Sequence, residues 1–455
     1  MIKNCWVVNH DRRVWAGIAA ANGRIVAIGN SDELPQAARV IDAEGRYLLP
    51  GAIDPHQHLG FVFPIDSDWR TETRSAAVGG VTTVFNYLWH AGSYVENFQK
   101  DLISAERNAL VDFVFETLMV SPHHNEEIHE LALRGVSGFK WFTCYKGDEG
   151  APWGITACDD GTILDGFRRV AALGPHACAK AHAENIEIIA RQRQQVLASG
   201  RGDLAAWADS RPGLAEGCDI EKLSYFARKA GTRLVILHIS SSEGVDALIK
   251  AKREGTTILG ETCPHYLSLT KHSAAGVRAK VIPPIQGQED QDKLWWAIET
   301  GVMDSIGSDH APTRLSDKTG DVWQAKQGFP GTATILPVML SEGVNKRGLP
   351  LEKVVEVTSY NNARWYGLFP KKGVISVGSD ADLVLVDLEK RVRGSVDAFK
   401  SASDYCLHEG IEFQGWPVMT IVRGRVIVDN GTVVGEPGWG QLQRAAEKVV
   451  EPALA

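Results

Sequence analysis

The spacing of apolar residues changes about fifty residues into the chain. Before that point, short apolar or alternating runs are separated by polar turns, and Asn22-Gly23 is typical of a tight hairpin turn. The pattern predicts short antiparallel strands at residues 5–8, 16–20, 24–28 and 39–42. A small β-structure is therefore expected at the N-terminus.

Beyond residue 50, apolar runs alternate with longer stretches of helical periodicity, which is typical of βαβ units around a parallel sheet. Eight runs predict strands at 47–54, 81–87, 113–120, 136–142, 177–182, 233–238, 257–262 and 304–309. Helices are expected between them, among others at 98–109, 164–172, 186–199, 220–230, 245–254 and 291–300. Eight alternating units have the size of a (β/α)8 barrel.

After the barrel the chain returns to short strands within 373–387 and 418–429. We expect these strands to join the first fifty residues. The predicted fold is thus α/β, a TIM barrel with a small β-sandwich built from both chain ends. The sandwich comprises 1–50 and 371–436, the barrel 51–370, and a helical tail 437–455. The insertion at 199–217 is expected to cover the barrel mouth or to contact another subunit.

The composition of the 455 residues excludes some classes of partner. A net charge of −8 leaves no basic stripe for nucleic acid or an anionic membrane, and no run approaches the roughly 20 apolar residues of a membrane span. No signal peptide is recognised at the N-terminus, and the seven cysteines are dispersed without a CxxC pair. These features predict a cytoplasmic protein that acts on a small molecule.

Potential metal ligands occur at the ends of five predicted strands, where (β/α)8 barrels carry their active sites. Strand alternation places both histidines of the His-Gln-His sequence after the first strand on the barrel interior, with Asp54 on the same face to fix a histidine tautomer. We expect the ligands to meet at the barrel mouth; they are His56, His58, Lys140, His182, His238 and Asp309.

Lys140 is the unusual member of this group, because a cationic lysine among four histidines would be costly to bury. Carboxylation of its amine by CO2 would make it an anionic ligand that bridges two metals. A lysine paired with a carboxylate, and Asp309 as a helix N-cap, are the alternatives, but they do not account for the other ligands. His265 and His310 are expected to support the site or the fold. His123, His124 and His129 are expected at the surface.

Six segments in order resemble the amidohydrolase superfamily, and within it the cyclic amidohydrolases: hydantoinases, dihydropyrimidinases and allantoinases. They are GAIDPHQH, GFKWFTCYKG, AHAEN, LHISS, ETCPHYL and GSDHAP, and the ending KKGVISVGSDADLVLVD is similar too. The resemblance implies two divalent metal ions, usually Zn2+. His56, His58 and Asp309 would hold one ion, His182 and His238 the other, and carboxylated Lys140 would bridge them.

The same resemblance implies a reaction. A metal-bridging hydroxide would attack the carbonyl of a cyclic amide, and Asp309 would act as general base and then as acid toward the leaving nitrogen. Tyr145, five residues after Lys140, matches a tyrosine that stabilises the oxyanion in hydantoinases. Ile282 and Gln327 occupy two substrate-binding positions, where hydantoinases carry Ser and Asn. A homotetramer is also implied.

Other residues bear on the substrate. Leu59-Gly60 follows His58, so the arginine of the dihydroorotase pattern HxHxR is missing. Trp141 is expected to point outward into the helix layer. Aromatic residues near the mouth are expected to line a pocket for an apolar ring substituent: Phe61, Phe63, Trp69, Trp89 and Trp153. Allantoinase activity is the alternative reaction. A non-catalytic assembly protein would lack some of the ligands, and a one-metal deaminase would lack Lys140.

Overall fold

The barrel is built from eight parallel strands that follow one another in chain order. The structure, a computed structural model, describes residues 1–146, 154–155 and 159–445. The strands pair in the order β13-β12-β11-β10-β9-β8-β7-β6. Their bounds are β6 (Ala52–Gln57), β7 (Val81–Leu88), β8 (Asp112–Leu118), β9 (Gly138–Phe142), β10 (Cys178–His182), β11 (Leu234–Ile236), β12 (Ile258–Thr262) and β13 (Ser305–Ile306).

The two ends of this sheet meet just beyond β13, where a bridge joins Gln57 to His310 and the Ser308 N–H donates to Asp54 Oδ1 at 2.9 Å. The predicted α/β fold with a (β/α)8 barrel is therefore confirmed.

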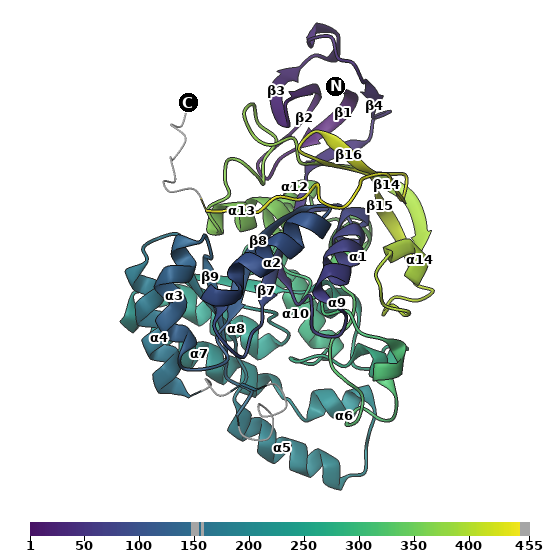
Figure 1. The fold of residues 1–455 in the computed structure, drawn as a ribbon. Helices are drawn as coiled ribbons and strands as arrows, with labels where there is room; N and C mark the ends of the chain where they lie inside the picture. The colour runs from purple at the N-terminus through teal and green to yellow at the C-terminus, as the bar shows by residue number, and fades with distance from the viewer. Residues whose placement is uncertain (147–153, 156–158, 446–455) are drawn as a thin grey trace.

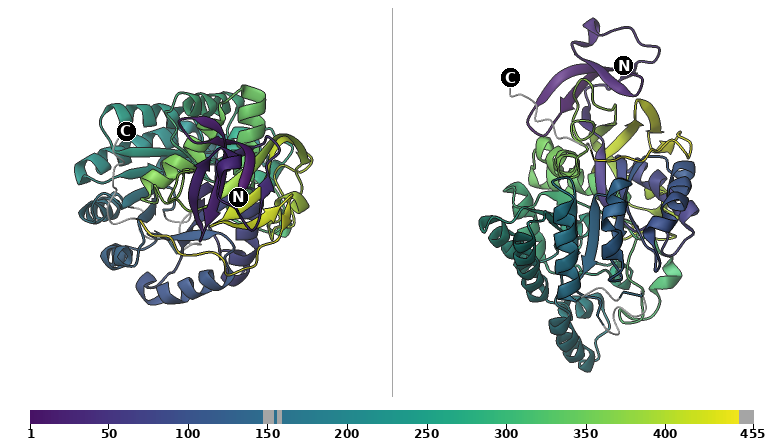
Figure 2. Two further views of the ribbon diagram at one scale, coloured as in Figure 1. Left: turned by 90° about the horizontal axis from the view of Figure 1, so that it is seen from above. Right: turned by 60° about the vertical axis from the view of Figure 1, so that its left-hand side comes forward.

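Helices surround the barrel (Figures 1 and 2). Several begin at a Ser, Asp or Asn whose side chain accepts a backbone N–H of the first turn, among them α2, α4, α5, α6 and α8. The main helices are α1 (Ile65–Val78), α2 (Tyr94–Asn108), α3 (His124–Leu133), α4 (Asp160–Ala172), α5 (Ile186–Ala198), α6 (Leu204–Asp209), α7 (Gly213–Ala230), α8 (Ser242–Arg253) and α10 (Gln288–Glu299).

Short helices complete the chain: α9 (Pro264–Ser268), α11 (Ile335–Val338), α12 (Leu351–Val355), α13 (Asn361–Trp365) and α14 (Val396–Phe399).

Trp141 shows how a strand locks onto this helix layer. Its ring lies 5.5 Å from that of Phe167 on α4, outside the barrel as predicted. A Cβ at Gly166 would lie 2.1 Å from the indole, so only glycine leaves room for it. The outward position of Trp141 leaves its neighbour Lys140 on the barrel interior.

The strands from the two chain ends form one mixed sheet at the end of the barrel opposite α5 and α6 (Figure 1). Leu383 pairs with Pro50, which joins the C-terminal strands to the N-terminal ones as predicted. The strands are β1 (Ile2–Val8), β2 (Arg13–Ala21), β3 (Arg24–Gly29), β4 (Ile41–Asp42), β5 (Tyr47–Pro50), β14 (Leu383–Arg393), β15 (Glu412–Val422), β16 (Arg425–Asp429) and β17 (Thr432–Val433).

The insertion at 199–217 contains α6 and the start of α7, and it reaches the barrel mouth. The indole N–H of Trp207 donates to the carbonyl of Val281 at 2.7 Å. This contact places α6 beside the loop that follows α9, in agreement with the first of the two expected positions. Among the described residues, no helix is both long and apolar enough to cross a membrane.

The expectation of a helical tail is wrong for residues 438–445, which contain no helix: a turn at Gly438 leads into a segment that bridges to β8 at Leu442. Gly438 and Gly440 both donate to the Ala109 carbonyl at 2.9 Å, and Gln443 donates to that of Phe113 at 2.7 Å. Glycines favour this conformation over a helix, and pairing with the backbone around β8 satisfies their N–H groups. Residues 446–455 lie outside the described part of the chain.

A buried ionic cluster fastens the barrel to the segment that leads into β14. The Lys372 ammonium contacts Asp112 at 2.7 Å, Asp380 at 3.3 Å and Asp382. Asp112 begins β8, so this one amine joins the barrel to the second sheet. Arg423 also contacts Asp112, and the half-exposed Lys371 lies 3.9 Å from Asp380, so the three buried carboxylates face three basic groups, of which only Lys372 is fully buried.

Replacing Lys372 with Met is expected to lower the free energy of unfolding by about 3 kcal/mol, because it leaves buried carboxylates without a cation. Denaturant unfolding measures the change. Lys371→Met is the matched control, with a side chain that is 48% exposed, and it should cost less than about 1 kcal/mol. Equal losses in the two variants would contradict this role of Lys372.

Candidate metal centre

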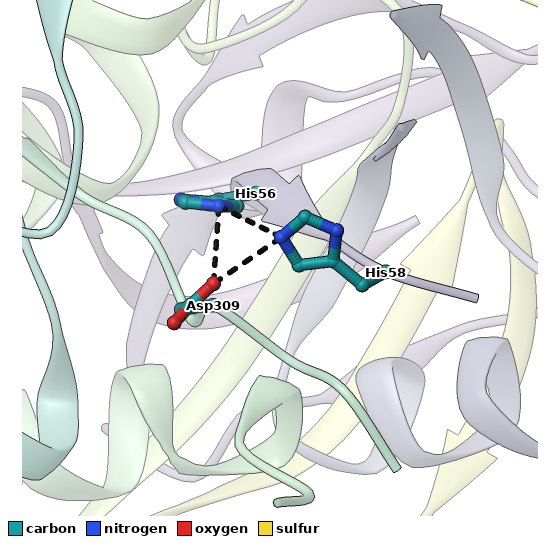
Figure 3. A group of neighbouring side chains, drawn as sticks. All are labelled: His56, His58 and Asp309. Atoms are coloured by element: carbon teal, nitrogen blue, oxygen red, sulfur yellow. Dashed lines mark hydrogen bonds and ion pairs between the residues drawn. The ribbon is translucent and has the colours of Figure 1, made fainter. Parts of the chain in front are cut away.

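Three of the predicted ligands form a compact group at the mouth of the barrel (Figure 3). His56 and His58 come from the end of β6, and Asp309 lies just after β13. His56 Nε2 is 3.2 Å from His58 Nε2 and 3.1 Å from Asp309 Oδ1, and the third distance, His58 Nε2 to Asp309 Oδ1, is 3.4 Å. Ligand atoms about 2.1 Å from a tetrahedral ion lie roughly 3.4 Å apart, so the spacing suits a metal.

Lys140 reaches the same group from β9. Its Nζ is 2.8 Å from His56 Nε2 and 3.2 Å from His58 Nε2, and its side chain is buried. Burial lowers the pKa of Lys140 to about 8, although Asp309 and Glu261 act in the opposite direction. A lowered pKa increases the fraction of neutral amine, the form that reacts with CO2. Burial and Lys140 lower the pKa of His58 to about 3, which keeps that imidazole neutral and able to bind a metal.

His182, at the end of β10, and His238, just beyond β11, lie beside this group. Their ring centroids are 4.5 Å apart, and the His238 ring is 5.3 Å from that of His56. The buried Nδ1 of His238 has no hydrogen-bond partner among the described residues. His238 and Asp309 both have positive φ, 42° and 49°, a conformation that non-glycine residues adopt rarely and often at functional sites.

Two glutamates fix the orientation of the histidines. Glu261 Oε1 is 2.7 Å from His56 Nδ1, so His56 directs Nε2 at the cluster. Glu184 Oε2 is 2.6 Å from His182 Nε2, and the buried Arg211 holds Glu184 at 3.1 Å. A carboxylate on one ring nitrogen leaves the other free for a metal, which is the usual arrangement of ligating histidines.

The expectation that Asp54 fixes a histidine tautomer is wrong. Its carboxylate accepts hydrogen bonds from Ser308, Gln57 and Thr332 and thereby closes the barrel between β6 and β13. Glu184 and Glu261 were missed by the sequence reasoning. Both are acidic residues within or just after a buried strand, and this sequence feature could have identified them.

The other five histidines considered in the sequence analysis lie outside the compact ligand group, three of them buried and two exposed. His310 Nδ1 accepts from the Gly331 N–H at 2.9 Å, and its Nε2 is 3.0 Å from Glu72. His265 is buried, with its ring 4.9 Å from that of Phe329. Neither belongs to the compact ligand group, as expected. His123 and His129 are exposed.

His124, expected at the surface, is buried at the start of α3. Its Nε2 is 3.1 Å from the Gly92 carbonyl. That tertiary contact, to a loop more than thirty residues earlier in the chain, explains why the local polar pattern led to the wrong prediction.

A cavity of about 370 Å3 opens over the cluster. Lys140, His58, His182, His238 and Asp309 line its polar side. Tyr145, Ile282 and Gln327 also line it, so the structure brings the predicted substrate-binding residues together with the predicted ligands. The apolar part of the wall includes Phe61, Val62, Trp89, Leu118, Phe142 and Ile155.

The predicted aromatic residues are only partly at this wall. Phe61 and Trp89 stack with centroids 5.5 Å apart. Trp69 was wrongly placed at the mouth: it is buried on α1, 5.3 Å from the Phe113 ring, because it lies on the helix face that packs onto the barrel. Phe63 lies 4.7 Å from the Arg314 guanidinium and does not line the cavity. Trp153 lies outside the described residues.

The chain is similar to known proteins over nearly its whole length. Residues 47–427 match the amidohydrolase family. The chain is 34% identical to the L-hydantoinase of Paenarthrobacter aurescens over 97% of both chains, and 35% identical to the allantoinase of Solibacter usitatus over 98% of this chain and 96% of that one. The dihydropyrimidinase structure from Brevibacillus agri is similar, with a TM-score of 0.90, 31% identity and 99% coverage of both chains.

Glu261→Gln is expected to lower the affinity for zinc about tenfold to a hundredfold, because His56 loses the carboxylate that fixes its ring. Competition with a chromogenic chelator measures the change. Glu299→Gln alters an exposed carboxylate at the end of α10 and is the control. Unchanged zinc affinity in Glu261→Gln would show that the contact with His56 does not prepare the site.

Proposed function

Because the chain belongs to the amidohydrolase family, a metal-dependent family, we propose that it hydrolyses the C–N bond of a cyclic amide, a hydantoin or a related ring. One observation carries the proposal. A buried lysine, three histidines and an aspartate line the polar side of a single cavity, and the rest of its wall is largely apolar. A fourth histidine, His56, contacts the same lysine. The names of the similar proteins, hydantoinases, allantoinases and dihydropyrimidinases, support the same class of substrate.

We propose that His56, His58 and Asp309 hold one zinc ion, that His182 and His238 hold a second, and that carboxylated Lys140 bridges them. The short distances among the first three ligand atoms support this assignment, as does the buried Nδ1 of His238, which has no hydrogen-bond partner in the described part of the chain. Two such ions would supply a water of lowered pKa and would polarise the amide carbonyl.

Asp309 is the proposed proton carrier. Its carboxylate lies at the cavity wall, within 3.4 Å of both His56 and His58. A carboxylate in this position can accept the proton of the attacking water and then deliver it to the ring nitrogen that departs. Burial acts to raise its pKa, but the neighbouring histidines outweigh burial and hold that pKa well below the usual range, so the group is ionised.

Tyr145 is the proposed oxyanion donor. Its side chain lines the cavity with its ring centroid 6.2 Å from that of His182. Burial raises the pKa of the Tyr145 hydroxyl well above its ordinary value, so the group keeps its proton and can donate it in a hydrogen bond. A donor aimed at the oxygen that becomes negative contributes roughly 3 kcal/mol to the transition state.

The apolar wall indicates the kind of ring substituent. Stacked Phe61 and Trp89, together with Ile282, favour an aryl or alkyl group over the polar ureido group of allantoin. We propose that backbone groups near Ile282 and Gln327 bind the –NH–CO– edge of the ring, because the side chain of Ile282 offers no hydrogen bond. The homotetramer implied by the resemblance and the cytoplasmic location expected from the cysteine pattern stay predictions.

Lys140→Met is expected to lose at least about a thousandfold in kcat/KM, because the bridging ligand disappears. The assay uses protein prepared with zinc and bicarbonate. The metal content of the variant should be lower than the about two ions per chain expected in the unmodified protein. Lys100→Met, at an exposed position on α2, is the control. Full activity of Lys140→Met would exclude a bridging role.

A hydantoin with a phenyl or benzyl group on its ring carbon is expected to give at least about tenfold higher kcat/KM than dihydrouracil or allantoin, because the substituent is buried against apolar side chains. Trp89→Ala should reduce that preference severalfold while leaving the turnover of dihydrouracil similar. A clear preference of the unmodified protein for dihydrouracil or allantoin would refute the assignment of the apolar wall to the substituent.

A further inference from the structure

The hydroxyl of Tyr145 has a single hydrogen-bond partner among the described residues, the side chain of Gln327. Gln327 Nε2 donates to Tyr145 Oη at 2.7 Å. The two residues reach the cavity from different elements, Tyr145 from the segment after β9 and Gln327 from the loop before α11, and both line its wall. The bond thus links two parts of the candidate site.

The backbone around Gln327 is firmly held. The buried Lys280 donates its Nζ to the Ala325 carbonyl at 2.6 Å, and its own carbonyl accepts from the Gly328 N–H at 3.2 Å. The buried Lys318 donates to the Lys326 carbonyl at 2.6 Å and to that of Gly328. The side-chain amide of Gln327 therefore reaches Tyr145 from a rigidly held backbone, and a residue that positions another group requires such support.

The direction of this bond determines what the tyrosine can do. A phenol has one O–H donor, and its oxygen also accepts. Because Gln327 occupies the accepting side of Tyr145 Oη, the hydroxyl proton stays available for another acceptor. A donor on the phenol oxygen also polarises the O–H bond and strengthens it as a donor. The free proton belongs to a group that faces the cavity, close to His182.

We propose that Gln327 is a positioning residue that orients the Tyr145 hydroxyl proton toward the carbonyl oxygen of the substrate. This inference rests on the proposed function, in which Tyr145 donates to the oxyanion. Gln327 acts through its side chain, in addition to any contact that its backbone makes with the ring. The effect belongs to the transition state, so it should appear in kcat rather than in KM.

The test compares the zinc-loaded unmodified protein with Gln327→Leu, Gln327→Asn and Gln327→Glu, each also made in a Tyr145→Phe background. Gln327→Leu removes the donor at similar volume, and Gln327→Asn shortens the side chain by one methylene. Both should lower kcat for a hydantoin about fivefold to tenfold, with KM within about twofold. Gln327→Glu should be slower still, because its carboxylate accepts the Tyr145 proton and withdraws it from the substrate.

In the Tyr145→Phe background, Gln327→Leu should change kcat by less than about twofold, since the group on which it acts has gone. Metal content and melting temperature are measured for each variant and should equal those of the unmodified protein. Gln324→Leu, at an exposed glutamine on the same loop, is the matched control and should leave kcat unchanged.

Equal losses with Tyr145 present and in the Tyr145→Phe background, or a Gln327→Glu variant as fast as the unmodified protein, would overturn the inference. An unchanged kcat in Gln327→Leu, with the unmodified protein active, would overturn it and leave the proposed function standing. No turnover of any cyclic amide by the zinc-loaded unmodified protein would overturn the proposed function and this inference together.

Discussion

The site depends on the burial of a lysine amine among imidazole nitrogens. Lys140 Nζ lies within 3.2 Å of His56 and His58 in the interior of the barrel, where a protonated amine is poorly solvated. In our proposal, carboxylation removes this conflict, because the charge of the side chain becomes negative and suits the cations that the histidines would bind. On our account the same carboxylation that makes the burial of Lys140 tolerable also makes it a metal ligand.

Residues of the surrounding fold hold the lysine and its neighbouring histidines in place, some by direct contact and others by closing or bracing the barrel. The contacts of Asp54 with Ser308 and Thr332 close the barrel and bring Asp309 to His56. Glu261 and Glu184 orient two of the histidines, and Arg211, from the insertion at the mouth, holds Glu184. The mouth insertion thereby contributes to the candidate metal centre as well as to its cover. At the opposite end of the barrel, Lys372 joins the second sheet to β8, so both chain ends stabilise the strand layer.

The fold, and the grouping of the candidate ligands at the barrel mouth, could be predicted because both follow from local patterns in the sequence. Buried parallel strands appear as apolar runs, and the residues at their ends must meet at one edge of the barrel. The errors concern side chains whose surroundings come from distant segments. The buried His124 contacts the carbonyl of Gly92, and Trp69 lies against β8. Glu261, rather than Asp54, contacts a histidine ring. The non-helical tail depends on the bridge between Leu442 and Phe113, which no local pattern shows.

The central claim is that carboxylated Lys140 bridges two zinc ions. A crystal structure of protein prepared with zinc and bicarbonate, with anomalous data collected at the zinc edge, tests it most directly. The account predicts two anomalous peaks roughly 3.5–4 Å apart, one beside His56, His58 and Asp309 and one beside His182 and His238, with carbamate density beyond Lys140 Nζ. A bare lysine amine, or a single peak at full zinc occupancy, would contradict it.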